Sequence, residues 1–126
     1  MTAADTSTWI AFLQGESGDA VQMLAKALGD RQVVMVPPVL TELLSDPALS
    51  PSVARTLSDL PLIDIGPGYW HRAGRMRSRV LAQHRKARLG DALIAQSCID
   101  GGVSLITRDR DFRAFVEGAG LKLIFG

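Results

Sequence analysis

The stretch of the sequence best suited to chemistry is residues 105–113, where an aliphatic segment runs into alternating arginine and aspartate. Leu105 and Ile106 are typical of a buried strand, and Asp109 and Asp111 follow them closely. Aspartates in this position either cap the next helix through their side-chain oxygens or contribute to a polar site at the end of a sheet. The residue types fit both roles.

Three further acids stand at comparable points of the chain. Asp5 follows a short N-terminal apolar segment, and Asp91 opens the apolar segment 92–99. Each of these two, taken alone, also fits a helix N-cap. Glu42 fits that role poorly, because the leucines and valine of segment 39–44 put its carboxylate beside an apolar stripe. A charge in such surroundings needs a partner or a cation.

The chemistry that these acids suggest depends on their meeting in space. Four carboxylates at one end of a sheet repel one another unless a cation lies between them. Carboxylate oxygens without histidine or cysteine neighbours favour Mg²⁺ or Mn²⁺. Such a site polarises a phosphodiester, generates hydroxide from bound water and stabilises the leaving oxygen. The pattern therefore indicates metal-dependent phosphodiester hydrolysis by Asp5, Glu42, Asp91 and Asp109, if the fold brings them together.

Other chemistries find less support in the sequence. His71 and His84 are isolated, and neither a nucleophile elbow nor a glycine-rich phosphate loop is present. A phospho-receiver domain remains open, with Asp64 as the phosphate acceptor and Lys122 on the last strand. That alternative calls for an acidic pair after the first strand, where Asp5 stands alone.

Short apolar segments that alternate with amphipathic ones must position these residues. We expect strands at residues 2–4, 32–36, 62–65, 103–107 and 121–125. We expect helices at about residues 7–14, 17–30, 39–46, 51–59, 69–87 and 91–101, and one more before the last strand. Strands that alternate with helices form a parallel sheet covered on both faces. We therefore predict one α/β domain, residues 1–126, with three layers and a central parallel sheet of about five strands.

Composition and cysteine content place the chain among ordinary globular proteins. Hydrophobic residues make up 47% and charged residues 21% of the 126 positions. The single cysteine, Cys98, excludes an internal disulfide framework and is expected to be buried and inert. The N-terminus lacks the features of a signal peptide, and no apolar run is long enough to span a membrane. We expect a cytoplasmic protein.

Positive charge is concentrated in one segment, although the net charge is only +1. Seven of the fourteen lysines and arginines lie within residues 72–88. Arg72, Arg75, Arg79 and Lys86 recur at helical spacing and can form one stripe along the predicted helix. Such a stripe either contacts RNA phosphates or is a solvated surface face.

Four segments together resemble the motif series of the PIN-domain family, and most closely its VapC-type ribonuclease toxins of bacterial toxin–antitoxin modules. They are "ADTSTWI" (4–10), "VLTELL" (39–44), "GDALIAQSCID" (90–100) and "LITRDRDF" (105–112). Each motif is weak alone, but the four occur in order across nearly the whole chain. One departure is the first strand, which is short and made of small residues instead of an aliphatic run.

The resemblance implies a parallel sheet between helices, RNA cleavage with Mg²⁺ or Mn²⁺, a homodimer and silencing by a cognate antitoxin. The metal ligands that it implies are Asp5, Asp91 and Asp109, with Glu42 and Asp111 as further candidates. It places Ser7, Thr107 and Asp111 around the pocket, and Arg108 near the RNA. A catalytically idle PIN-like module that binds a partner is the alternative.

The two aspartates of the segment 105–113 are expected to divide their roles. An acid followed by apolar residues three apart is typical of a helix start, and this favours a helix that begins at Asp111. Asp111 would then cap backbone N–H groups near Arg113 and Ala114, while Asp109 serves the metal.

Overall fold

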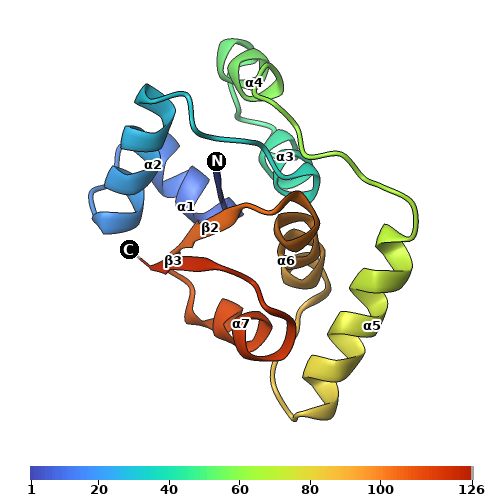
Figure 1. Ribbon diagram of the computed structural model, residues 1–126. Helices are drawn as coiled ribbons and strands as arrows, with labels where there is room; N and C mark the ends of the chain where they lie inside the picture. Colours follow the sequence, from blue (N-terminus) through green and yellow to red (C-terminus); the bar gives the residue numbers. More distant parts are fainter. Residues whose placement is uncertain (126) are drawn as a thin grey trace.

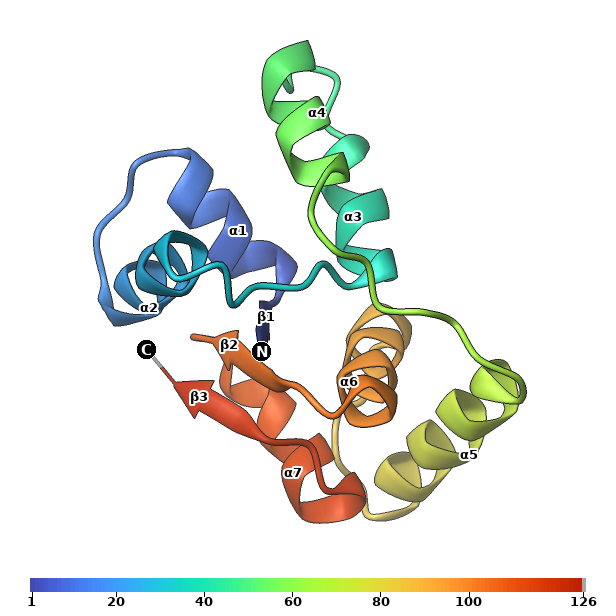
Figure 2. The ribbon, with the colours of Figure 1, turned by 45° about the horizontal axis from the view of Figure 1, so that its top comes forward.

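The computed structural model describes residues 1–125, and a small parallel sheet lies at its centre (Figure 1). The strands are β1 (Thr2–Ala4), β2 (Ser104–Thr107) and β3 (Leu123–Phe125). The helices are α1 (Thr6–Leu13), α2 (Asp19–Gly29), α3 (Pro37–Leu44), α4 (Pro51–Ser58), α5 (Tyr69–Ala82), α6 (Leu89–Gly101) and α7 (Arg113–Ala119), with a short 3₁₀ helix, η1 (Arg110–Phe112). Helices α1 and α2 lie on one side of the sheet and α6 and α7 on the other (Figure 2). The predicted α/β class with a parallel sheet is confirmed.

Register in the sheet brings distant parts of the chain to one edge. The strand order is β1-β2-β3 and all pairs are parallel, with Ala4 opposite Ile106 and Ile106 opposite Ile124. Because β1 and β2 run in the same direction, their carboxyl ends lie side by side. The residues that follow each strand, Asp5 and Arg108, therefore emerge at the same edge of the sheet.

Three strands form ladders within residues 1–125, whereas the sequence predicted about five. The predicted segments 32–36 and 62–65 make only single bridges, Thr2 with Val33 and Met35 with Leu62. Prolines limit both segments: Pro37 and Pro38 follow the first, and Pro61 precedes the second. Proline lacks the N–H that a longer ladder needs, so the pairing beyond β1 stops after one bridge at each segment.

Helix α5 is also shorter than predicted, because it ends at Ala82 and not near residue 87. His84 adopts a left-handed conformation (φ 58°), which a continuing helix cannot contain. The following segment is tied back to α5 by a hydrogen bond of 2.7 Å from Arg77 Nε to the carbonyl of Ala87. Lys86 consequently lies outside the helix on whose face it was predicted.

Burial of large apolar side chains holds the helices against the sheet. Trp9, Tyr69, Phe112 and Phe115 are among the largest side chains that are almost fully buried. Cys98 is fully buried, as predicted, and burial raises the pKa of its thiol to about 12. A thiol in this environment is unreactive. Within residues 1–125, no helix is long and apolar enough to cross a lipid bilayer.

Candidate active site at the carboxyl ends of the strands

Four aspartates from three segments lie close enough to influence one another electrostatically at the carboxyl ends of β1 and β2. The evidence is the carboxyl group of Asp91, whose pKa rises from 3.8 to about 6. Burial is the largest cause, and the charge of Asp109 comes next; Asp5 and Asp111 add smaller contributions, and Arg88 opposes them. We call Asp5, Asp91, Asp109 and Asp111 the acid cluster.

Asp5 is the buried member of the acid cluster, with 3% of its surface exposed. As the N-cap of α1, its Oδ1 atom accepts hydrogen bonds from the backbone N–H of Thr8 (3.1 Å) and from the Thr8 hydroxyl (2.5 Å). Its Oδ2 atom accepts from the hydroxyls of Thr107 (2.7 Å) and Ser7 (3.1 Å). The two hydroxyl residues predicted to line the pocket, Ser7 and Thr107, thus both contact Asp5.

These four donors determine how Asp5 can act. A carboxylate offers about four lone-pair sites, so all of them are occupied. A hydroxyl has to turn away before Asp5 can bind a cation directly, and Ser7 is the exposed one. Thr8, which the sequence analysis did not single out, has a sequence signal: it stands three residues after an N-cap aspartate.

Asp91 differs from Asp5 in having no hydrogen-bond donor. It lies in the first turn of α6 and is partly buried, and no donor within residues 1–125 contacts its carboxylate. The positive end of the helix dipole favours a negative charge at this position. Burial and the neighbouring acids nevertheless prevail, as the raised pKa shows. The carboxylate is therefore available to a proton or a cation.

Asp109, and not Asp111, provides the cap that the sequence predicted for Asp111. Asp109 Oδ1 accepts a hydrogen bond from the backbone N–H of Asp111 (2.9 Å) and caps η1. The backbone N–H of Asp109 itself donates to the Thr107 hydroxyl (3.0 Å). Asp111 caps no helix; its Oδ2 atom pairs with Lys86 Nζ at 3.1 Å. The prediction that Asp111 is the cap was wrong because the helical turn begins at Arg110, one residue earlier than expected.

Glu42 lies at the rim of the cluster. It is exposed on α3 and not beside the core, and the Thr6 hydroxyl donates to its Oε1 atom at 2.8 Å. Its charge is not among the causes that raise the pKa of Asp91. Glu42 also borders an apolar groove of about 450 Å³ that includes Trp70 and Gly90. Glu42 therefore joins α1 to α3 and reaches the acid cluster less directly than predicted.

The acid cluster fits a hard divalent cation by the chemistry of its donors, since every donor is a carboxylate oxygen. Within residues 1–125, no three histidine, cysteine, aspartate or glutamate side chains converge into a ready-made metal cage. Asp91, Asp109 and Asp111 have no hydroxyl donor on their carboxylates, but Asp111 is already paired with Lys86. A cation bound there would remove the repulsion that raises the pKa of Asp91.

The predicted basic stripe is not continuous. Arg72 donates to Asp100 and to the carbonyl of Pro67, so its guanidinium is already occupied. Lys86 lies beyond the end of α5 beside Asp111. Arg108 approaches Glu16 at 3.8 Å. Of the residues predicted to contact RNA, Arg75 and Arg79 remain together on α5, where both line one pocket.

Comparison with known proteins identifies the family. The model of the PIN domain matches residues 3–117. Comparison with curated protein sequences finds no match.

Solved structures of similar fold include three bacterial complexes. The VapBC2 complex of Rickettsia felis, bound to a DNA fragment from its promoter, aligns with a TM-score of 0.75 and 19% identity, over 99% of this chain and 98% of that chain. VapBC-5 of Mycobacterium tuberculosis, a member of the VapBC family of toxin–antitoxin systems, aligns with a TM-score of 0.70 and 19% identity, over 99% of this chain and 98% of that chain. FitAcB of Neisseria gonorrhoeae aligns with a TM-score of 0.69 and 16% identity, over 98% of this chain and 96% of that chain. The structural alignments show a shared fold. Because the family model matches most of the sequence, the chain belongs to the PIN-domain family.

Proposed function

We propose that the protein is an Mg²⁺- or Mn²⁺-dependent endoribonuclease and the toxin of a toxin–antitoxin pair. The observation that carries the proposal is the meeting of four aspartates at the carboxyl ends of β1 and β2, where burial, and after it the charges of Asp109, Asp5 and Asp111, raises the pKa of Asp91. A fold that concentrates charges of one sign at a strand edge loses stability by doing so. A bound cation would neutralise these charges, which would explain why the fold brings them together.

Each member of the acid cluster then has a role. Asp91 and Asp109 hold the cation, with Asp5 as the third ligand once the Ser7 hydroxyl turns away. A bound divalent cation supplies a Lewis acid and a hydroxide at neutral pH. Thr8 and Thr107 keep Asp5 in one orientation, and Glu42 holds α1 against α3 through Thr6. Lys86, beside Asp111, is placed to contact a phosphate oxygen at the edge of the cluster.

The partners in this proposal are RNA, a second copy of the chain and an antitoxin. Membership of the PIN-domain family supports a nuclease, and the three similar structures are of protein complexes, one of them described as a toxin–antitoxin system. A receiver-like signalling role has little basis in this fold, because Asp64 is exposed in an irregular segment and does not end a strand.

The test is cleavage of labelled single-stranded RNA by the purified chain with Mg²⁺ or Mn²⁺, compared with the same reaction in a chelator and with a DNA of matched sequence. Asp91→Asn removes the charge while keeping the shape of the side chain. Asp19→Asn is the matched control, since Asp19 is also an acid in the first turn of a helix, but an exposed one on α2. Metal-dependent cleavage that Asp91→Asn abolishes and Asp19→Asn retains is the expected result.

The idle binding module makes the opposite prediction. A chain that only sequesters a partner cleaves neither RNA nor DNA with any divalent metal, and Asp91→Asn leaves its binding to that partner unchanged. Equal cleavage by the wild-type chain and by Asp91→Asn would remove the acid cluster from the mechanism.

A further inference from the structure

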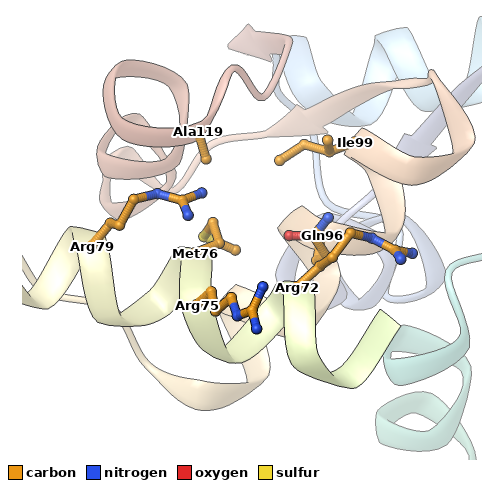
Figure 3. A pocket seen from close by; sticks show the side chains of 7 residues that line it. All are labelled: Arg72, Arg75, Met76, Arg79, Gln96, Ile99 and Ala119. Carbon is orange, nitrogen blue, oxygen red and sulfur yellow. The ribbon is translucent and has the colours of Figure 1, made fainter. Parts of the chain in front are cut away.

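A second polar region lies in a pocket between α5, α6 and the end of α7 (Figure 3). Its volume is about 300 Å³. The lining residues are Arg72, Arg75, Met76, Arg79, Gln96, Ile99 and Ala119. Three of these seven are arginines, and all three come from α5 at helical spacing. We call Arg75 and Arg79 with the space between them the arginine pocket.

The three arginines differ in what they bind. Arg72 forms a two-armed contact with Asp100 and a third hydrogen bond to the carbonyl of Pro67. Within residues 1–125, no hydrogen bond or ion pair engages the guanidinium of Arg75 or of Arg79. The two are one helical turn apart, so they project from the same face of α5. The pocket therefore has two guanidinium groups whose donors are unused.

The surrounding residues leave this positive charge uncompensated. Asp100 is the nearby acid, but Arg72 lowers the pKa of its carboxyl and Gln96 Nε2 donates to it at 2.8 Å. Met76, Ile99 and Ala119 supply apolar walls. Unpaired like charges one turn apart on a helix repel each other, and an anion bound between them would relieve that repulsion.

The arginine pocket is separate from the acid cluster. Helix α6 runs from Asp91 at the cluster to Ile99 at the pocket, a separation of eight residues or about 12 Å along the axis. The segment after α5 links the two regions on the other side, where Arg85 pairs with Glu117 of α7 and Lys86 pairs with Asp111 of η1. Cationic side chains thus occur at intervals from the pocket to the cluster.

We infer that the arginine pocket binds a phosphate group of the RNA strand, remote from the phosphodiester at the acid cluster. The identity of the ligand as RNA rests on the proposed function. Guanidinium groups bind phosphate through two parallel hydrogen bonds each, which is the geometry that two free arginines on one face can offer. Arg72 is not a ligand, because its donors are already used. The pocket gives affinity and register to the RNA, and the acid cluster performs the cleavage.

The experiment measures binding of a labelled single-stranded oligoribonucleotide in a chelator, so that binding is separated from cleavage. The variants are Arg75→Glu with Arg79→Glu, and the milder pair Arg75→Gln with Arg79→Gln. Arg55→Glu is the matched control, because Arg55 is an exposed arginine on α4, away from α5 (Figure 1). Thermal unfolding of every variant establishes that it is folded.

The expected result is a loss of affinity of at least about tenfold for the charge reversal and a flatter dependence on salt. Each lost phosphate contact reduces the slope of log K against log salt by about 0.7 for single-stranded RNA, so two contacts reduce it by about 1.4. The glutamine pair should show the same change of slope if it is folded, which keeps the test valid should the reversal unfold the protein. Arg55→Glu should change the slope by less than half of that amount.

An unchanged affinity and slope in both arginine pairs, with RNA cleavage intact in the wild type, overturns the arginine pocket while leaving the acid cluster in place. That result assigns the pocket to an acidic protein partner. Absence of metal-dependent RNA cleavage by the wild type, in contrast, counts against the proposed function and not against phosphate binding. Displacement of the RNA from the wild type, but not from the glutamine pair, by inorganic phosphate would support the pocket independently.

Discussion

The acid cluster and the arginine pocket both place like charges close together, but they do so by different means. The acids come from three separate segments, after β1, at the start of α6 and after β2. The arginines come from one helix and lie a single turn apart. The acids are partly or fully buried, and hydrogen bonds orient Asp5 and Asp109, whereas Arg75 and Arg79 are held only by the helix that carries them.

This difference indicates what each region is for. Burial, and after it the charges of the neighbouring acids, raises the pKa of Asp91 and makes that end of the sheet responsive to a cation. The hydrogen bonds to Asp5 fix its position before any ligand arrives, which is what chemistry requires. Exposed arginines on one helix face can adjust to a flexible strand, which suits binding.

The largest difference should appear in catalysis. Asp91→Asn should lower the cleavage rate at saturating RNA and Mg²⁺ at least about a hundredfold, because it removes a carboxylate that is proposed to hold the cation. Arg75→Gln with Arg79→Gln should raise KM and leave kcat within about threefold, because binding remote from the reacting bond acts equally on substrate and transition state. Steady-state kinetics of both variants decide the matter. A similar loss of kcat in the arginine variant would mean that catalysis and binding are not divided between the acid cluster and the arginine pocket.

The second prediction concerns the pH dependence of stability without metal. The pKa of Asp91 is raised to about 6 in the folded state, so its contribution to stability is fully present below about pH 4 and lost as pH rises through 6. Because Asp91 is only partly buried, solvent screens its charge, and the loss should be on the order of 1 kcal/mol and smaller at high salt. Urea unfolding at about pH 5 and about pH 7 should show a decline in the wild type that Asp91→Asn lacks.

Addition of Mg²⁺ to the wild type at neutral pH should restore stability, because a ligand that binds only the folded state stabilises it by RT ln(1 + [L]/Kd). The Arg75→Gln, Arg79→Gln variant should lose stability with rising pH, and regain it with Mg²⁺, to the same extent as the wild type. An equal decline with pH in Asp91→Asn and in the wild type would place the charge repulsion elsewhere.

A third prediction separates the two ways in which acids are held within the cluster. Asp5→Asn should reduce the free energy of unfolding by about 1–2 kcal/mol, because an amide offers one acceptor oxygen where the carboxylate accepts four hydrogen bonds. The urea midpoint of Asp5→Asn below that of Asp91→Asn under the same conditions is the expected observation. Reversal of that order would mean that the hydrogen bonds around Asp5 contribute little.

The smallest expected effect is the difference in stability between alanine variants of Asp109 and Asp111. Asp109→Ala should cost about 1 kcal/mol of stability through loss of the cap on η1. Asp111→Ala should cost less than about 0.5 kcal/mol, because it breaks only a partly exposed ion pair with Lys86. Paired denaturation curves measure both. A larger loss for Asp111→Ala would restore the role that the sequence first suggested for it.

The sequence determined the features that depend on neighbours along the chain. Apolar periodicity predicted helices α1 to α7 of the described residues to within a few residues at most ends, and the alternation of helices with apolar segments predicted the parallel sheet. The arginines of α5 were also visible, because helical spacing follows from residue numbers alone. Asp5, Asp91 and Asp109 could be named because each stands next to an element boundary, and parallel strands bring such boundaries to one edge.

Only the tertiary structure decided how these parts interact, because pairing depends on contacts between residues far apart in the chain. The end of α5 at Ala82 moved Lys86 away from the arginines and set it beside Asp111. The start of η1 at Arg110 gave the cap to Asp109. Thr107, 102 positions from Asp5, donates a hydrogen bond to it because β1 and β2 are adjacent and in register. Charge and spacing can be read from a sequence, but which charge meets which partner is set by the register of the sheet and by where each helix ends.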